Sequence, residues 1–184
     1  MAPEKLTTLA EKLGMTTHLS PLLMKARRLG LDATGLERTA MQRGCDYYHD
    51  GSPPPSVTVS RAELSDGELA LALLNPALRY HPQTLRLGAA MLGAAANDPD
   101  DLARRTREER CELVVSHIAQ AGRRFEPGNA FWQRLLALLP ATPPAKPGVL
   151  PHPTRFVAMT GVTRRGVETV TQWIRPASRP PTHG

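Results

Sequence analysis

The chain has 184 residues, of which 41% are hydrophobic, 22% charged and 4% aromatic, and its formal net charge is +6 at pH 7. Most of its core must come from Leu, Ala, Val and Met, which suits packed helices better than a β-sandwich. Two cysteines do not make a disulfide framework, and the longest apolar runs, such as LALALL and LLALLP, are too short to span a bilayer. The first residues, MAPEKLTTLAEKLG, carry charges where a signal peptide needs an apolar run. We therefore expect a soluble, cytoplasmic protein with no membrane partner.

Helix signals recur along the first 139 residues. Leu9, Ala10 and Leu13 share one helical face before Gly14, which predicts a first helix over 4–13. Ser20 followed by Pro21 has the residue types of an N-cap and a first helical position. The same reasoning predicts further helices over 20–30, 35–43, 65–75 and 82–96, one from 98, one from about 108 to 122 and one over 129–139.

The stretch PQTLRLGAAMLGAAA, which begins at Pro82, is rich in small residues. Gly88 and Gly93 would let a neighbouring helix approach closely, so we expect this helix at the centre of a bundle. The helix before it should be well defined at its start, because Ser65 and Glu68 have the spacing of a capping box.

Proline marks two irregular segments. GSPPPSVTVS predicts a loop that leads into a brief extended piece. Near Pro140 the composition changes sharply, because residues 140–184 hold nine of the 18 prolines and six Lys or Arg against the single acid Glu168. We interpret 1–139 as a helical domain, 140–154 as a stiff Pro-rich linker, 155–175 as a β-hairpin with RRG near its turn, and 176–184 as a disordered tail.

The stretch CDYYHD collects Cys45, Asp46, His49 and Asp50 within six residues. These side chains could hold a metal or arrange a Cys–His nucleophile, but the same residue types are typical of a turn after a helix that ends at Gly44. Cys111 shares a helical face with core positions, so we expect it to be a small buried residue. The sequence contains none of the common phosphate-loop, dinucleotide, zinc-protease or serine-hydrolase motifs. We therefore expect no cofactor, and an enzyme stays the weaker alternative.

Residues 6–31, LTTLAEKLGMTTHLSPLLMKARRLGL, partly resemble a helix-turn-helix unit. Leu9, Ala10 and Gly14 match the usual apolar, small and turn positions, but Pro21 lies where the second helix should already be running. The basic residues Lys25, Arg27 and Arg28 would lie on that second helix and be available for phosphates. An ordinary helical hairpin with a solvated basic face is the alternative.

The C-terminal segment supplies a second group of cations. Its arginines, which would suit contact with a phosphate backbone, are Arg155, Arg164, Arg165, Arg175 and Arg179. The alternatives are a hairpin that docks on the bundle, with Phe156 and Trp173 as its packing residues, and a strand pair that completes the sheet of a partner. The run LARRTREERCE alternates basic and acidic residues, which predicts a solvated helix surface with salt bridges.

We therefore predict a mainly α protein, a bundle of about six to eight helices with a Pro-rich linker and a small C-terminal β-hairpin. The leading functional hypothesis is a non-enzymatic protein that contacts DNA or RNA through Lys25, Arg27 and Arg28 and through the hairpin arginines. The alternative is a protein-interaction adaptor or assembly factor that uses an apolar groove of the bundle.

Overall fold

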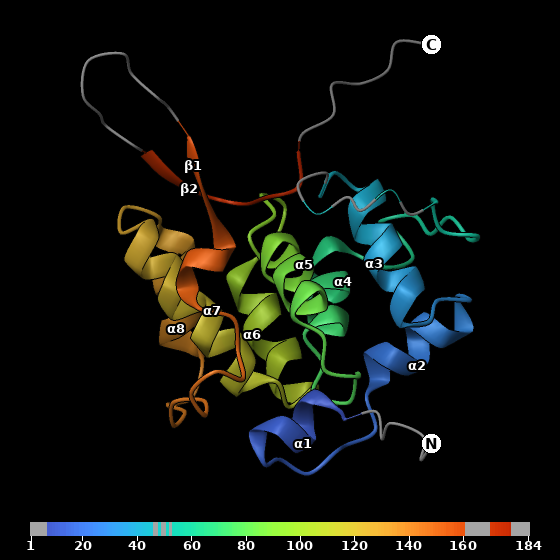
Figure 1. Ribbon diagram of the computed structural model, residues 1–184, viewed down its shortest axis with the longest axis horizontal. Helices are drawn as coiled ribbons and strands as arrows, with labels where there is room; N and C mark the ends of the chain where they lie inside the picture. The colour runs from blue at the N-terminus through green and yellow to red at the C-terminus, as the bar shows by residue number, and fades with distance from the viewer. Residues whose placement is uncertain (1–6, 46–47, 49–50, 52, 161–169, 178–184) are drawn as a thin grey trace.

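The computed structural model describes residues 7–45, 48, 51, 53–160 and 170–177. Within these residues it has eight α-helices: α1 (Leu9–Leu13), α2 (Pro21–Arg28), α3 (Ala33–Gln42), α4 (Asp66–Leu73), α5 (Pro82–Leu92), α6 (Pro99–Glu108), α7 (Glu112–Phe125) and α8 (Ala130–Leu138). The short 3-10 helix η2 (Pro153–Phe156) leads into β1 (Val157–Thr160), which pairs antiparallel with β2 (Val170–Trp173). The predicted mainly helical fold with a C-terminal hairpin is confirmed (Figure 1).

Side chains at the helix starts explain where several helices begin. Thr8 and Ser65 each form a capping box with the glutamate three residues later, and Ser20 accepts a hydrogen bond from the Leu23 amide at the start of α2. Asp98 does the same for α6, ahead of Pro99. These side chains satisfy amides that have no partner within the helix, so the chain leaves its loop conformation at these residues.

The core is centred on α4 and α5, which lie in the middle of the molecule with α7 and α8 on one side and α2 and α3 on the other (Figure 1). Every residue of α4 is buried. Gly88 of α5 faces α4 so closely that an added Cβ would lie 2.6 Å from the Leu74 side chain. The small residue therefore permits the close approach that the sequence predicts for a central helix.

Three details differ from the sequence-based expectations. Helix α1 begins at Leu9, five residues later than predicted, because Thr8 is its N-cap. Helix α5 ends at Leu92, four residues earlier than predicted, where Gly93 packs against the Trp173 ring. The break between α6 and α7 falls at Glu109–Cys111, and Arg110 takes a positive φ of 53° there. Helix α7 therefore begins four residues later than expected.

The C-terminal segments pack on the helices. Phe156 and Trp173 are almost fully buried, and the Trp173 indole donates to the Ala89 carbonyl at 3.2 Å. After β2 the chain crosses α5 toward α3 (Figure 1), where the Ala177 amide donates to the Gly44 carbonyl. The described residues of the hairpin therefore dock on the helical bundle. No helix in the described part of the chain is long and apolar enough to cross a membrane.

Candidate functional site

Helix α2 is anchored by a buried carboxylate. Glu109, which lies between α6 and α7, accepts hydrogen bonds from the Ser20 hydroxyl, from the Leu22 amide at 3.0 Å and from the Asn75 amide group at 3.0 Å. The Glu109 carboxylate therefore binds the N-terminal end of α2, where the helix dipole is positive. This contact holds α2 against the bundle. It supplies the negative charge that the first turn of α2 lacks.

The three predicted cations of α2 have different surroundings. The Lys25 ammonium lies 2.9 Å from the buried Glu68 carboxylate of α4, so it forms an internal ion pair. Arg27 and Arg28 are exposed, and among the described residues neither guanidinium has an acidic partner. The structure thus leaves Arg27 and Arg28 at the surface and uses Lys25 to attach the helix.

An apolar groove of about 560 Å³ runs beside Arg27. We call it the α2 groove, and its lining includes Leu19, Leu23, Met24, Arg27, Leu31, Leu36 and Leu78. Leu19 is 81% exposed and Met24 43% exposed, so two large apolar side chains of this groove face solvent. Asp32 also lines the groove, but its carboxylate accepts the Gly35 amide as the cap of α3.

The predicted cations of the hairpin are not equivalent either. Arg175 forms two hydrogen bonds of 2.6 Å to the Glu126 carboxylate, and its Nε donates to the Gly93 carbonyl at 2.8 Å. Arg155 is exposed at the end of η2. Arg164, Arg165 and Arg179 lie outside the described residues. Of the two hairpin arginines that the structure describes, Arg155 is therefore free to face solvent and Arg175 is held in an ion pair.

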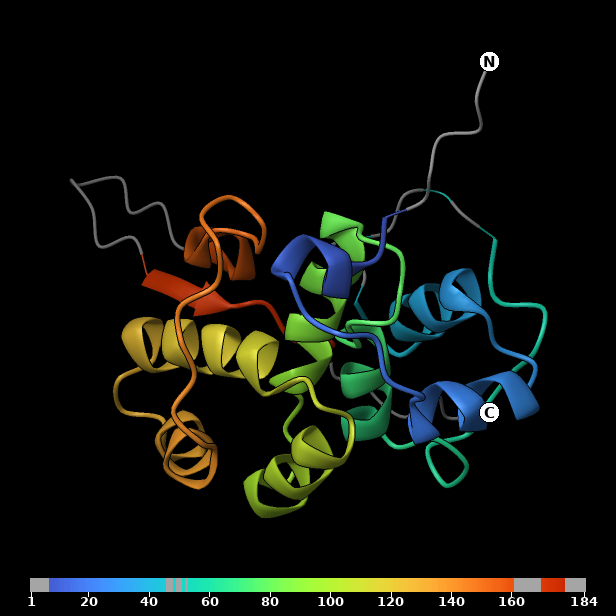
Figure 2. The same ribbon diagram turned by 90° about the horizontal axis from the view of Figure 1, so that it is seen from below.

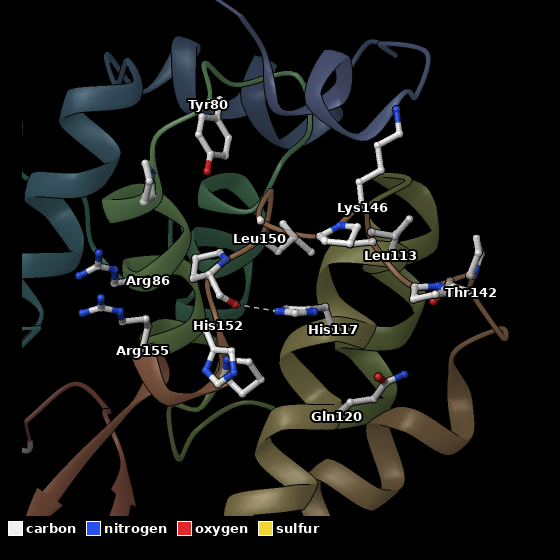
Figure 3. A pocket seen from close by; sticks show the side chains of 18 residues that line it. Tyr80, Arg86, Leu113, His117, Gln120, Thr142, Lys146, Leu150, His152 and Arg155 are labelled. Atoms are coloured by element: carbon white, nitrogen blue, oxygen red, sulfur yellow. Dashed lines mark hydrogen bonds between the residues drawn. The ribbon is translucent and has the colours of Figure 1, made fainter.

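A second groove, of about 870 Å³, lies between the Pro-rich segment 140–153 and helices α5 and α7. We call it the proline groove (Figure 3). Two side chains fix the segment in place: the Tyr80 hydroxyl donates to the Val149 carbonyl at 2.9 Å, and His117 Nε2 lies 2.9 Å from the Pro151 carbonyl oxygen. Leu113 and Leu150 contribute apolar surface to the groove, and Arg86 and Arg155 lie at one end of it.

Both cysteines are buried in the core. Cys45 is buried with its Sγ 3.5 Å from the Met91 sulfur, whereas Asp46, His49 and Asp50 lie outside the described residues. Cys111 is fully buried, as predicted; burial, with the nearby Glu109 and Glu112, raises the pKa of its thiol far above the usual range. Within the part of the chain that the structure describes, no group of three or more His, Cys, Asp or Glu side chains could hold a metal ion.

The adaptor alternative expected an apolar groove, but the sequence could not locate either of these two grooves, for a physical reason. The exposure of Leu19 depends on the extended connection between α1 and α2, and apolar residues carry no mark that distinguishes an exposed leucine from a core one. Arg86 and Arg155 are 69 positions apart in the sequence and meet only because the Pro-rich segment returns to the bundle. One available signal was the late start of α2 at Pro21, which indicated a longer connection there.

Compared with known proteins, the chain matches no protein-family model, no curated protein and no solved structure.

Proposed function

We propose that the protein is an interaction module whose α2 groove binds an acidic amphipathic segment of a partner protein. The exposure of Leu19 and Met24 beside this groove is the observation that carries the proposal. Exposed large apolar residues that line one concave surface are typical of a protein-binding site, because burying them releases water from both partners.

The charges around the α2 groove favour an acidic partner. Arg27 lines the groove and Arg28 follows it on α2, and both are exposed without acidic partners among the described residues. The carboxylate of Asp32 is already engaged at the start of α3. A helix with leucines on one face and glutamates beside them would fill the groove and pair with these arginines.

Contact with a nucleic-acid backbone is the second candidate, and among the described cations predicted for it, it rests on the exposed Arg27, Arg28 and Arg155. Lys25 and Arg175 add little to it, because each is held in an ion pair with a glutamate. These arginines and a charge of +6 would support weak, salt-dependent binding to phosphates, which does not use the apolar surface of Leu19 and Met24. The two candidates therefore predict different effects of apolar substitutions.

The test measures fluorescence anisotropy of a labelled helical peptide with leucines at positions i, i+3, i+4 and i+7 and glutamates elsewhere. A peptide with lysines in place of the glutamates and a labelled DNA duplex are measured beside it across salt. We expect Leu19→Ser/Met24→Ser to weaken binding of the acidic peptide by about tenfold or more, since two apolar side chains leave the interface. Arg27→Gln/Arg28→Gln should weaken it by a smaller factor, and the affinity of this variant should depend less steeply on salt.

The matched control is Arg123→Gln/Arg124→Gln, which removes two exposed arginines from the last turn of α7 and gives the same net charge. This variant should bind the acidic peptide as the unchanged protein does. Equal binding of the acidic and basic peptides, or equal loss in both arginine variants, would contradict the proposal. Binding of the duplex alone, with loss only in the Arg27/Arg28 variant, would favour the nucleic-acid candidate instead.

A further inference from the structure

The proline groove holds two cations at one end, and no acidic residue is among the described residues that line it. Arg86 comes from α5 and Arg155 from η2, and their side chains extend toward the same edge of the groove in Figure 3. Among the described residues, neither guanidinium has an ion-pair partner or a side-chain hydrogen bond. Two like charges that line the same groove raise the local potential and attract an anion.

Arg86 is the more unusual of the two arginines. Its residue is half-buried, and its Nε is covered by protein atoms and lacks a hydrogen-bond acceptor in the described structure. A partly buried guanidinium is usually satisfied by a carboxylate or a carbonyl, because removing its charge from water is costly. An anion bound at its outward-facing NH groups would offset this cost.

The rest of the groove suits the organic part of a ligand. Its volume of about 870 Å³ is within the range of small-molecule sites, and Leu113 and Leu150 supply apolar surface. The hydrogen bonds of Tyr80 and His117 hold the opposing Pro-rich wall in place. Proline also restricts the backbone of this wall, so little conformational entropy would be lost on binding.

We propose that the proline groove binds a phosphate monoester, with its phosphate group between Arg86 and Arg155 and its organic group directed into the groove. A phosphate monoester carries a charge of about −1.5 to −2 at pH 7, which matches two guanidinium groups better than the single charge of a carboxylate does. Its oxygens also accept the paired NH donors of arginine with good geometry. This site is separate from the α2 groove and does not depend on the function proposed for that groove.

The test follows the arginine Nε–H signals of the isotopically labelled full-length protein by NMR while phenyl phosphate is added at constant ionic strength. Benzoate, phenol and inorganic phosphate are titrated separately. We expect saturable shifts of the Arg86 and Arg155 signals with phenyl phosphate, and binding about tenfold weaker or more for benzoate, since half of the ligand charge is lost. Inorganic phosphate should bind more weakly than phenyl phosphate because it lacks the apolar group.

Two variants and a control complete the experiment. Arg86→Gln and Arg155→Gln should each weaken phenyl phosphate binding by about tenfold or more, because each removes one charged partner. Arg38→Gln is the matched control: Arg38 is also half-buried with a covered, unbonded Nε, but it lines neither groove. The proposal is overturned by the lack of a saturable shift, by equal affinity for benzoate, or by an equal effect of Arg38→Gln.

Discussion

Glu126 shows how much one side chain connects in this protein. Its carboxylate accepts hydrogen bonds from both terminal nitrogens of Arg175 at 2.6 Å and from the Trp132 indole at 2.7 Å. Burial alone would raise the pKa of Glu126, but these hydrogen bonds and the positive charge of Arg175 outweigh it and lower the pKa to about 2. The ionised carboxylate therefore ties the segment after β2 to the end of α7 and to α8.

This pKa predicts a loss of stability in acid. The ordinary pKa of the group is 4.5, so its contribution to the free energy of unfolding is fully present above that pH and is lost as the pH falls toward about 2. Because Arg175 is 28% exposed and Glu126 18% exposed, solvent reduces this contribution, and we expect ~2 kcal/mol. Urea unfolding of the unchanged protein and of Glu126→Gln, measured between pH 7 and pH 2, tests this.

The two proteins should differ most at pH 7 and converge near pH 2. Glu108→Gln is the control, since Glu108 pairs with Arg104 on an exposed helix surface and such pairs contribute little. A constant difference between the unchanged protein and Glu126→Gln across this pH range would show that the ionised carboxylate is not the cause.

At the residue scale, short-range roles could be predicted and long-range ones could not. The caps at Ser20 and Ser65 follow from spacings of three residues, which are visible in the sequence. The partners of Lys25 and Arg175 lie 43 and 49 positions away, so nothing local shows that these cations are used internally. Their proposed contacts with nucleic acid were reasonable from charge alone, but the structure gives both side chains another partner.

At the scale of elements, the contact between α4 and α5 depends on the absence of a side chain at Gly88. A Cβ there would meet the Leu74 side chain at 2.6 Å and the Leu73 Cβ at 3.3 Å. Since both leucines are buried in the centre of the core, neither has free space into which to move.

We expect Gly88→Ala to lower the free energy of unfolding by about 2 kcal/mol, even though alanine is the better helix former. The control is Gly128→Ala, because an added Cβ there has no atom within 4 Å. Chemical denaturation followed by circular dichroism compares the two. Equal stability of both variants would mean that α4 and α5 separate at little cost.

The helices themselves were largely predictable because caps, proline and apolar spacing agree for most of them. The prediction was wrong at the start of α7, which was expected near residue 108 and begins at Glu112. Glu109 instead lies buried before the helix and binds the start of α2, which is a contact across 87 positions in the chain. A local pattern cannot distinguish a glutamate that caps its own helix from one that caps a helix distant in the sequence.

At the scale of the whole molecule, the two C-terminal strands bring an aromatic cluster into the core. The Trp173 ring lies 4.7 Å from Trp132 of α8 and 5.5 Å from Phe156, measured between ring centroids. Figure 2 shows β1 and β2 lying across the helical layer that contains α7. The change of composition near Pro140 is real, but it does not coincide with the edge of the hydrophobic core, because packing and not composition determines where a core ends.

If the strands complete the core, damage to them should destabilise helices that are remote in sequence. We expect Trp173→Ala to lower the free energy of unfolding by about 4 kcal/mol, since it removes a large buried ring and leaves a cavity beside Trp132 and Gly93. The readout is far-ultraviolet circular dichroism during urea unfolding, which reports the helices and not the hairpin. Gln172→Ala, at the exposed neighbouring position of β2, should leave the helix transition unchanged. An unchanged helix transition in Trp173→Ala as well would mean that the helices are stable without the hairpin, whereas the predicted shift requires that residues 7–139 and the C-terminal strands unfold as one cooperative unit.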